Sequence, residues 1–285
     1  AVSHEFIKNP NRHRRSFQPV PLFSNNLWYA PALSRVLALG STFWQLVEST
    51  RPWRLINFST HSVSLKMLEE MDFWDATVVN EDSRQFWRGY FAFAGDHQVE
   101  PIFLPVYMDA GAVPSFMRTL KNQYLQRLRW AYGIEHFPYV VRESIKHSEI
   151  PLQDRLVKLY RLFEANFSWA TASLFIAFAG WLPILLNREF SQTVLAFNIP
   201  FLTSRLLVIT WIGLVISAWL SLRLAPPRPA NVSKHASIFM ILQWMLVPIA
   251  AIFFGSIPAI EAQTRLMIGK YLGFWTTEKV SAVTR

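Results

Sequence analysis

The chain has 285 residues, of which 52% are apolar and only 16% charged, with a formal net charge of +9 and no cysteine. Because a typical soluble domain is about 25% charged, this composition excludes a disordered chain, a collagen and a coiled coil. The lack of cysteine excludes a disulfide scaffold, a zinc knuckle and cysteine catalysis. Only three of the 19 acidic residues follow position 166, as expected where lipid is the solvent.

Residues 1–150 form the polar half, where the pattern predicts short strands mixed with helices. The basic loop Asn9–Arg15 comes first. A solvated or lipid-facing patch is its simpler interpretation, and contact with a ligand phosphate is the sharper one. His61, His97 and His136 lack the spacing of metal ligands, and we interpret them as structural. The chain has no glycine-rich phosphate loop and no metalloprotease or serine-hydrolase motif.

Two adjacent acids stand where a short apolar run meets a predicted helix. The run Val78–Asn80 leads into Glu81 and Asp82, and a helix is expected over Ser83–Ala94, with Gly95 as its end. The sequence therefore predicts that both acids lie at a strand-to-helix junction. An acid there caps the helix and is stabilised by the helix dipole. The same dipole keeps a carboxylate ionised, as a general base requires, and both interpretations stay open from the residues alone.

A second helix is predicted from about Pro114 to Tyr132. On it Gln126, Arg129 and Trp130 have the spacing of one helix face. A guanidinium binds a phosphate bidentately, and an indole offers a flat apolar surface with one donor, which suits a sugar ring. The alternative is a tryptophan in the core and an arginine at the surface.

Residues 151–166 predict an amphipathic helix, because Leu152, Leu156, Leu159 and Phe163 recur at helical spacing. We expect this helix to lie in the lipid headgroup layer, with a soluble surface helix as the alternative. Its basic residues favour a cytoplasmic position for the polar half.

Residues 167–260 predict a transmembrane region, because they contain uncharged runs near the roughly 20 residues that a spanning helix needs. Buried core helices are the alternative interpretation. The spans are expected at about 167–187, 202–222 and 236–257.

The last span bears on the side of the membrane at which the chain ends. Pro248 lies in the middle of the third uncharged run and interrupts helical hydrogen bonding. We predict that residues 236–260 do not form one simple span. The amphipathic segment 261–285 would then end on the cytoplasmic side, together with Lys279.

The order of these motifs resembles the membrane-bound glycosyltransferases of family 2, which include cellulose, hyaluronan, chitin and poly-N-acetylglucosamine synthases. An acidic pair, a Gln-x-x-Arg-Trp motif at 126–130, an interface helix and spans follow one another. The tail Phe274–Lys279 is similar to the F-x-V-T-x-K gating loop of cellulose synthases, with Thr276 in place of valine. The stretch from Ser59 to Asp82 resembles a bacterial branch of the family, and the resemblance covers the chain from about residue 50.

The resemblance implies an α/β fold joined to membrane α-helices. Residues 1–150 would be the C-terminal, acceptor half of a GT-A glycosyltransferase domain. Asp82 matches the catalytic base at the end of the family's T-E-D motif, in which Asn80 replaces the threonine. The residues that the resemblance assigns to the acceptor and the diphosphate are Glu81, Gln126, Arg129 and Trp130. Those that it assigns to a gating loop over the nucleotide are Phe274, Thr277 and Lys279.

The implied reaction is the inverting transfer of a sugar from a nucleotide sugar, expected to be a UDP-sugar, to a saccharide acceptor. It implies a multi-pass protein of the inner or plasma membrane with a cytoplasmic catalytic part, and polysaccharide synthesis as its role. Mg²⁺ or Mn²⁺ is expected in the full-length protein, but this chain has no D-x-D metal motif. Because the chain also opens at Ala1 without a signal peptide, we interpret it as an N-terminally truncated fragment that is inactive alone.

Two other functions remain open. A non-catalytic membrane scaffold or transporter subunit would account for the spans and for the lone Arg205 among apolar residues. A non-processive transferase would use a lipid-linked acceptor. A nucleic-acid partner is not expected, because it would leave the lipid-length runs without an explanation.

Overall fold

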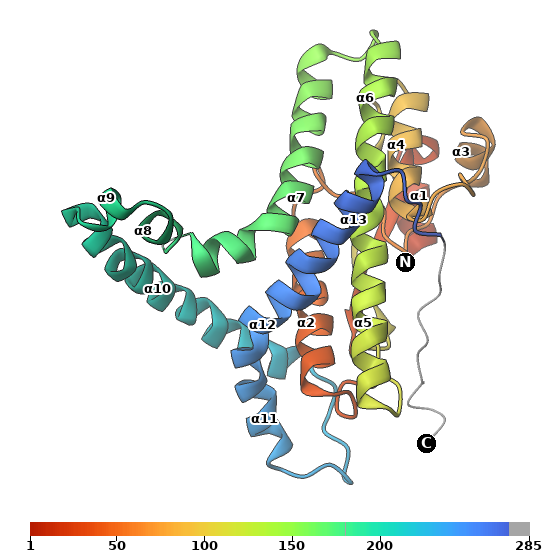
Figure 1. The fold of residues 1–285 in the computed structure, drawn as a ribbon. Coiled ribbons are helices and arrows are strands. Elements are labelled where there is room, and N and C mark those ends of the chain that lie inside the picture. The colour runs from red at the N-terminus through yellow and green to blue at the C-terminus, as the bar shows by residue number, and fades with distance from the viewer. Residues whose placement is uncertain (180, 274–285) are drawn as a thin grey trace.

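The protein, in a computed structural model that describes residues 1–179 and 181–273, is mostly helical (Figure 1). The described residues contain one small sheet of two parallel strands. Strand β1 (Arg15–Phe23) pairs with β2 (Gln98–Met108), and the register shifts after Pro19. Helix α2 (Ala32–Ser49) packs on β1, where Thr42 Oγ1 accepts a hydrogen bond from Phe23 N at 3.2 Å. The predicted α/β architecture is therefore limited to this sheet, and no GT-A fold is identified in the described part of the chain.

Helices make up most of the rest of the polar half. Besides α2, they are α1 (Val2–Lys8), α3 (Leu65–Glu70), α4 (Glu81–Ala92), α5 (Phe116–Ala131) and α6 (His136–Lys146), with the 3-10 turns η1 (Arg12–Arg14) and η2 (Tyr132–Glu135). Helix α5 confirms the helix predicted from about Pro114 to Tyr132. It begins after Ser115, whose side chain accepts from Arg118 N at 3.4 Å and so caps the helix.

Helix α4 begins at Glu81, so both acids lie inside its first turn. The strand predicted just before it is wrong, because residues 78–79 form a bend and Asn80 is in irregular structure. Val79 is buried against α5, and its N–H donates to Glu135 Oε1 at 3.0 Å. The apolar character of this run therefore reflects packing between helices, and its backbone bonds to a side chain where a strand would bond to a neighbouring strand.

The predicted interface helix and the start of the first predicted span form one helix, α7 (Leu152–Phe178). Helix α7 ends before a span is complete, and the short helices α8 (Leu182–Leu186) and α9 (Arg188–Ser191) follow. Pro183 lies in the first turn of α8, where its missing N–H is tolerated, whereas it would interrupt a longer helix. Among the described residues of 167–187, two separate helices, α7 and α8, therefore stand where a single helix was expected.

Two helical segments are long and apolar enough to cross a membrane. One is α10 (Val194–Leu224), whose apolar window is fully exposed and which contains the expected 202–222 span. The other runs from Ala236 to Met267. Its parts are α11 (Ala236–Leu242), the 3-10 turn η3 (Gln243–Leu246), α12 (Val247–Ala251), the π-helical turn η4 (Ile252–Ser256) and α13 (Ile257–Met267).

The second of these segments leaves α-helical geometry on both sides of α12, which carries Pro248. A proline removes one backbone donor, so local changes of helix type are expected near it. The segment nevertheless continues as one helical path, and whether it crosses a membrane stays a prediction. Phe274, Thr277 and Lys279 lie outside the described residues, so the gating loop and the side of the tail stay predictions too.

Helix α13 joins the apolar half of the chain to α5 (Figure 1). Ala259 and Ala262 are fully buried in a cluster with Leu128 of α5 and Ala170 of α7. Small side chains let helix backbones approach closely. The hydroxyl of Tyr124 on α5 also donates to Glu261 on α13. The helix with the Gln-x-x-Arg-Trp motif is therefore packed directly on a candidate membrane segment.

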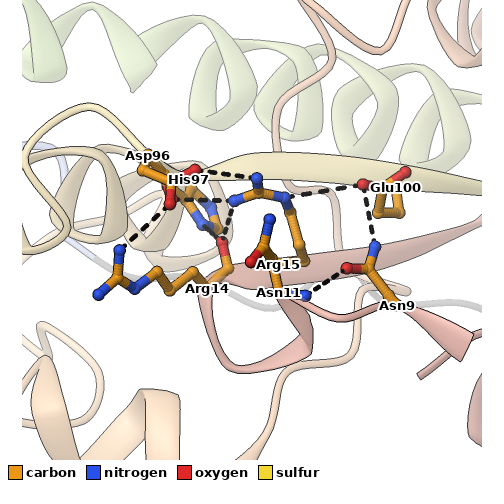
Figure 2. A network of polar contacts seen from close by, with 7 residues as sticks. All are labelled: Asn9, Asn11, Arg14, Arg15, Asp96, His97 and Glu100. Carbon is orange, nitrogen blue, oxygen red and sulfur yellow. Dashed lines mark hydrogen bonds and ion pairs between the residues drawn. The ribbon is translucent and has the colours of Figure 1, made fainter. Parts of the chain in front are cut away.

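The basic loop Asn9–Arg15 is tied to the start of β2 (Figure 2). Arg15 is buried, and its Nη2 lies 2.9 Å from Asp96 Oδ1. Arg14 Nη1 lies 3.2 Å from the other oxygen of Asp96, and Arg14 O accepts from His97 Nδ1 at 2.9 Å. These contacts support a structural role for the two arginines over contact with a ligand phosphate.

The fully buried His97 is expected to make the protein less stable in mild acid. Burial lowers the pKa of His97 to about 4, below about 6.5 in an unfolded chain. The unfolded state therefore binds the proton first, and stability is lost as the pH falls from about 6.5 towards 4. Between pH 7 and 5 this amounts to about 2 kcal/mol.

Thermal unfolding in detergent at pH 7 and pH 5 measures this loss. His97→Gln should lower the difference by about 2 kcal/mol, because glutamine does not titrate, while the buried His136, whose pKa is lowered to about 3, keeps its own share. The exposed His4→Gln serves as a matched control and should keep the wild-type difference. An unchanged pH dependence in His97→Gln would contradict the prediction.

Candidate functional site

The first turn of α4 is docked on the last turn of α5. Asn80 precedes α4, and its Nδ2 donates to the carbonyl of Arg129 at 2.9 Å. Gly133 faces the same amide, since a Cβ atom at position 133 would lie 3.3 Å from Asn80 Nδ2. This dock brings the acidic pair next to the Gln-x-x-Arg-Trp motif, although the two are far apart in the sequence.

Asp82 is a partly buried carboxylate near a positive charge. Its Oδ1 accepts a hydrogen bond from Ser83 N at 2.7 Å. Burial raises the pKa of Asp82 to about 6, and the negative charge of Glu81 adds to this rise. The Ser83 N–H and the positive charge of Arg129 act in the opposite direction. The carboxylate is therefore ionised at neutral pH, yet it binds a proton far more readily than an ordinary aspartate.

Trp130 is held between a loop and an arginine. Its ring lies edge-on to Phe58, with 6.1 Å between the ring centroids. The guanidinium of Arg127 lies 4.9 Å from the centroid of its ring and donates to Leu37 O at 2.9 Å and to Ser41 Oγ at 3.0 Å on α2. Burial lowers the pKa of Arg127 to about 10, so it is still charged at neutral pH. Arg127 thus fixes Trp130 against α2.

The predicted site residues separate into two neighbouring groups. Gln126 and Trp130 line a small cavity that also borders Asp109 and Gly111. Arg129 is absent from that lining and acts on Asp82. The three residues predicted on one helix face therefore do not share one site. Gln126 and Trp130 face the cavity, whereas Arg129 acts on Asp82, and the two groups are linked because Arg129 and Trp130 are consecutive in the chain. Glu81 lies beside Asp82 in the first turn of α4.

Sequence reasoning missed four residues that shape this site. Arg127 lies inside the motif, between Gln126 and Arg129, and this position is the one sequence signal that could have marked it. Ser83 had only its place after the acidic pair, and Glu135 and His136 had no recognisable pattern. The last two become relevant only because the chain after α5 turns back towards α4.

The described residues contain no cluster of three or more histidine, cysteine, aspartate or glutamate side chains that fits a metal ion. Because Mg²⁺ is often bound by one or two carboxylates together with substrate phosphates, the Mg²⁺ or Mn²⁺ that the resemblance implies stays an expectation.

Comparison with known proteins identifies no relative of this chain. No protein-family model, no curated protein sequence and no solved structure matches the chain. The site is therefore interpreted from its own contacts, from the titration behaviour of Asp82 and from the motif resemblance in the sequence.

Proposed function

We propose that the chain forms the acceptor side of a membrane-bound glycosyltransferase that transfers a sugar from a nucleotide sugar, with inversion, to a saccharide. In this proposal Asp82 is the catalytic base, Arg129 neutralises the leaving diphosphate and Trp130 supports the acceptor sugar. Polysaccharide synthesis at the inner or plasma membrane is the proposed role.

One observation carries the proposal. The dock between Asn80 and the Arg129 carbonyl, at 2.9 Å, joins a carboxylate with a pKa of about 6 to a helix end with a guanidinium and an indole. A general base works best when its pKa lies near the operating pH. A guanidinium favours a diphosphate through paired, charge-assisted hydrogen bonds. A scaffold or transporter subunit would not need a carboxylate of raised pKa beside a guanidinium and an indole.

The proposed reaction couples one proton transfer to one displacement at the anomeric carbon. The Asp82 carboxylate takes the proton of an acceptor hydroxyl while that oxygen attacks the anomeric carbon. The bond from the anomeric carbon to the diphosphate oxygen breaks, and the nucleoside diphosphate leaves with the electron pair. Ser83 N holds Oδ1 of Asp82 at 2.7 Å, so the carboxylate is oriented before the acceptor arrives. The positive charge of Arg129 stabilises the leaving group.

The two long apolar helical segments support a position at the lipid bilayer. With α13 packed on α5, a membrane segment would lie beside the acceptor site. This favours an acceptor held at the membrane surface, either a growing polysaccharide or a lipid-linked saccharide, and leaves a non-processive transferase as the second enzyme class.

The proposal is tested with membranes that contain the full-length protein. We expect radiolabel from a UDP-sugar, offered in a panel of common hexoses and N-acetylhexosamines, to enter a product that a glycosidase degrades. A protein that binds none of these nucleotide sugars and incorporates none of them would favour the scaffold or transporter function.

A further inference from the structure

Helix α4 begins without a side-chain cap from its own N-cap residue, Asn80, because that amide bonds to Arg129 O. The carboxylate of Glu135, the residue just before α6, instead bonds to the backbone that leads into α4. Glu135 Oε1 accepts from Val79 N at 3.0 Å and from Asn80 N at 3.4 Å. Negative charge at a helix N-terminus is favoured by the helix dipole. Glu135 thus ties down the backbone that leads into Asp82.

The neighbouring residue forms a second tie to the same turn. His136 Nε2 lies 2.8 Å from Ser83 Oγ, and the backbone N–H of Ser83 donates to Asp82. Burial lowers the pKa of His136 to about 3, so its ring is neutral at physiological pH and does not add charge to the site. The contact between the buried His136 ring and the half-buried Ser83 hydroxyl joins two uncharged groups, so its effect is to hold the turn in place.

We propose that Glu135 and His136 are positioning residues that clamp the first turn of α4 and so aim the Asp82 carboxylate at the acceptor. The inference rests on the proposed role of Asp82 as base, and it adds two residues that no motif marks. The clamp belongs to the same continuous stretch as Arg129 and Trp130. Residues 129–136 therefore fix the position of both the proposed base and the proposed acceptor platform. A shift of about 1 Å between two such groups costs on the order of 10²-fold in rate.

The test first measures the clamp without any activity. The chain has no cysteine, so Asp82→Cys introduces a single thiol whose reaction with a maleimide reports how open the turn is. In this background we expect Glu135→Ala to speed labelling by about tenfold, since it removes both backbone hydrogen bonds. Glu135→Gln keeps an acceptor oxygen and should label nearly as slowly as its parent. Ser83→Ala removes the contact with His136 and the longer bond from Ser83 Oγ to Asn80 O at 3.3 Å, and it should have an intermediate effect.

Glu143→Ala is the matched control, because Glu143, on α6, is also a carboxylate but pairs with Lys146, at 2.7 Å. It should leave the labelling rate unchanged. Thermal melting shows that each variant is folded. Unchanged labelling in Glu135→Ala would overturn the clamp.

Kinetics of the full-length protein then test the link to catalysis. Glu135→Ala should lower kcat by about 10- to 100-fold with little change in KM for the nucleotide sugar, because only the base is misplaced. Glu135→Gln should keep most of kcat. An equal loss in both variants, or a loss confined to KM, would overturn the positioning role. Suppose that Glu135→Ala speeds labelling in the Asp82→Cys background but the wild-type full-length protein transfers no sugar. The clamp would then stand, and the proposed function would be rejected.

Discussion

Replacing Asp82 with asparagine is expected to lower sugar transfer by the full-length protein by about 10²–10⁴-fold while nucleotide-sugar binding persists. Asparagine has the same shape, and its oxygen still accepts the hydrogen bond that Ser83 N gives to Asp82 at 2.7 Å. It does not take a proton from the acceptor hydroxyl, so only the chemical step is lost. Radiolabel incorporation measures transfer, and equilibrium dialysis of labelled nucleotide sugar measures binding.

The wild-type protein supplies a second measurement of the same role. Because burial raises the pKa of Asp82 to about 6, kcat/KM should fall as the pH drops through about 6, where the base becomes protonated. Asp72→Asn is a matched control, since Asp72 is exposed and has a positive φ of 57° that asparagine also adopts. Near-normal turnover by Asp82→Asn would remove Asp82 from this role.

Arg129→Ala is expected to reduce kcat by about 10²–10³-fold, the usual loss when one group that stabilises developing charge is removed. It should also move the acid limb of the pH profile. The positive charge of Arg129 lowers the pKa of Asp82, so its removal should raise that pKa above about 6. The variant would then lose activity at a higher pH than the wild-type protein does. Steady-state kinetics between pH 5 and 8 measure both effects.

Arg129→Lys separates the two contributions. Lysine keeps the positive charge near Asp82, so the acid limb should stay close to its wild-type position. It lacks the planar fork that binds a diphosphate, so kcat should still fall. Arg142→Ala, an exposed position on α6, controls for loss of a cation and should change neither quantity. If Arg129→Ala left both kcat and the acid limb unchanged, the diphosphate role would be wrong.

The sequence by itself determined the elements whose information is local. Helix α5 was predicted with Pro114 near its start and α4 with Gly95 as its end, and both lie within about two residues of the predicted bounds. The long apolar helix α10 follows from composition, since a mostly apolar run near lipid length is legible without any neighbour. The candidate base, guanidinium and indole were likewise identified from residue type and spacing.

Only the tertiary structure decided how these residues meet. The Asn80 amide selects Arg129 O, Arg127 stacks on Trp130, and Glu135 reaches back to α4. Each contact joins residues whose partners are set by how α2, α4, α5 and α6 pack.

The misread elements have the same cause. Residues 78–80 are apolar because they pack between helices, and α7 joins two segments whose compositions differ. Hydrophobic periodicity reports which side of a segment is buried. The partner that buries it is fixed only when the whole chain packs, because packing and hydrogen-bond energies depend on groups distant in sequence.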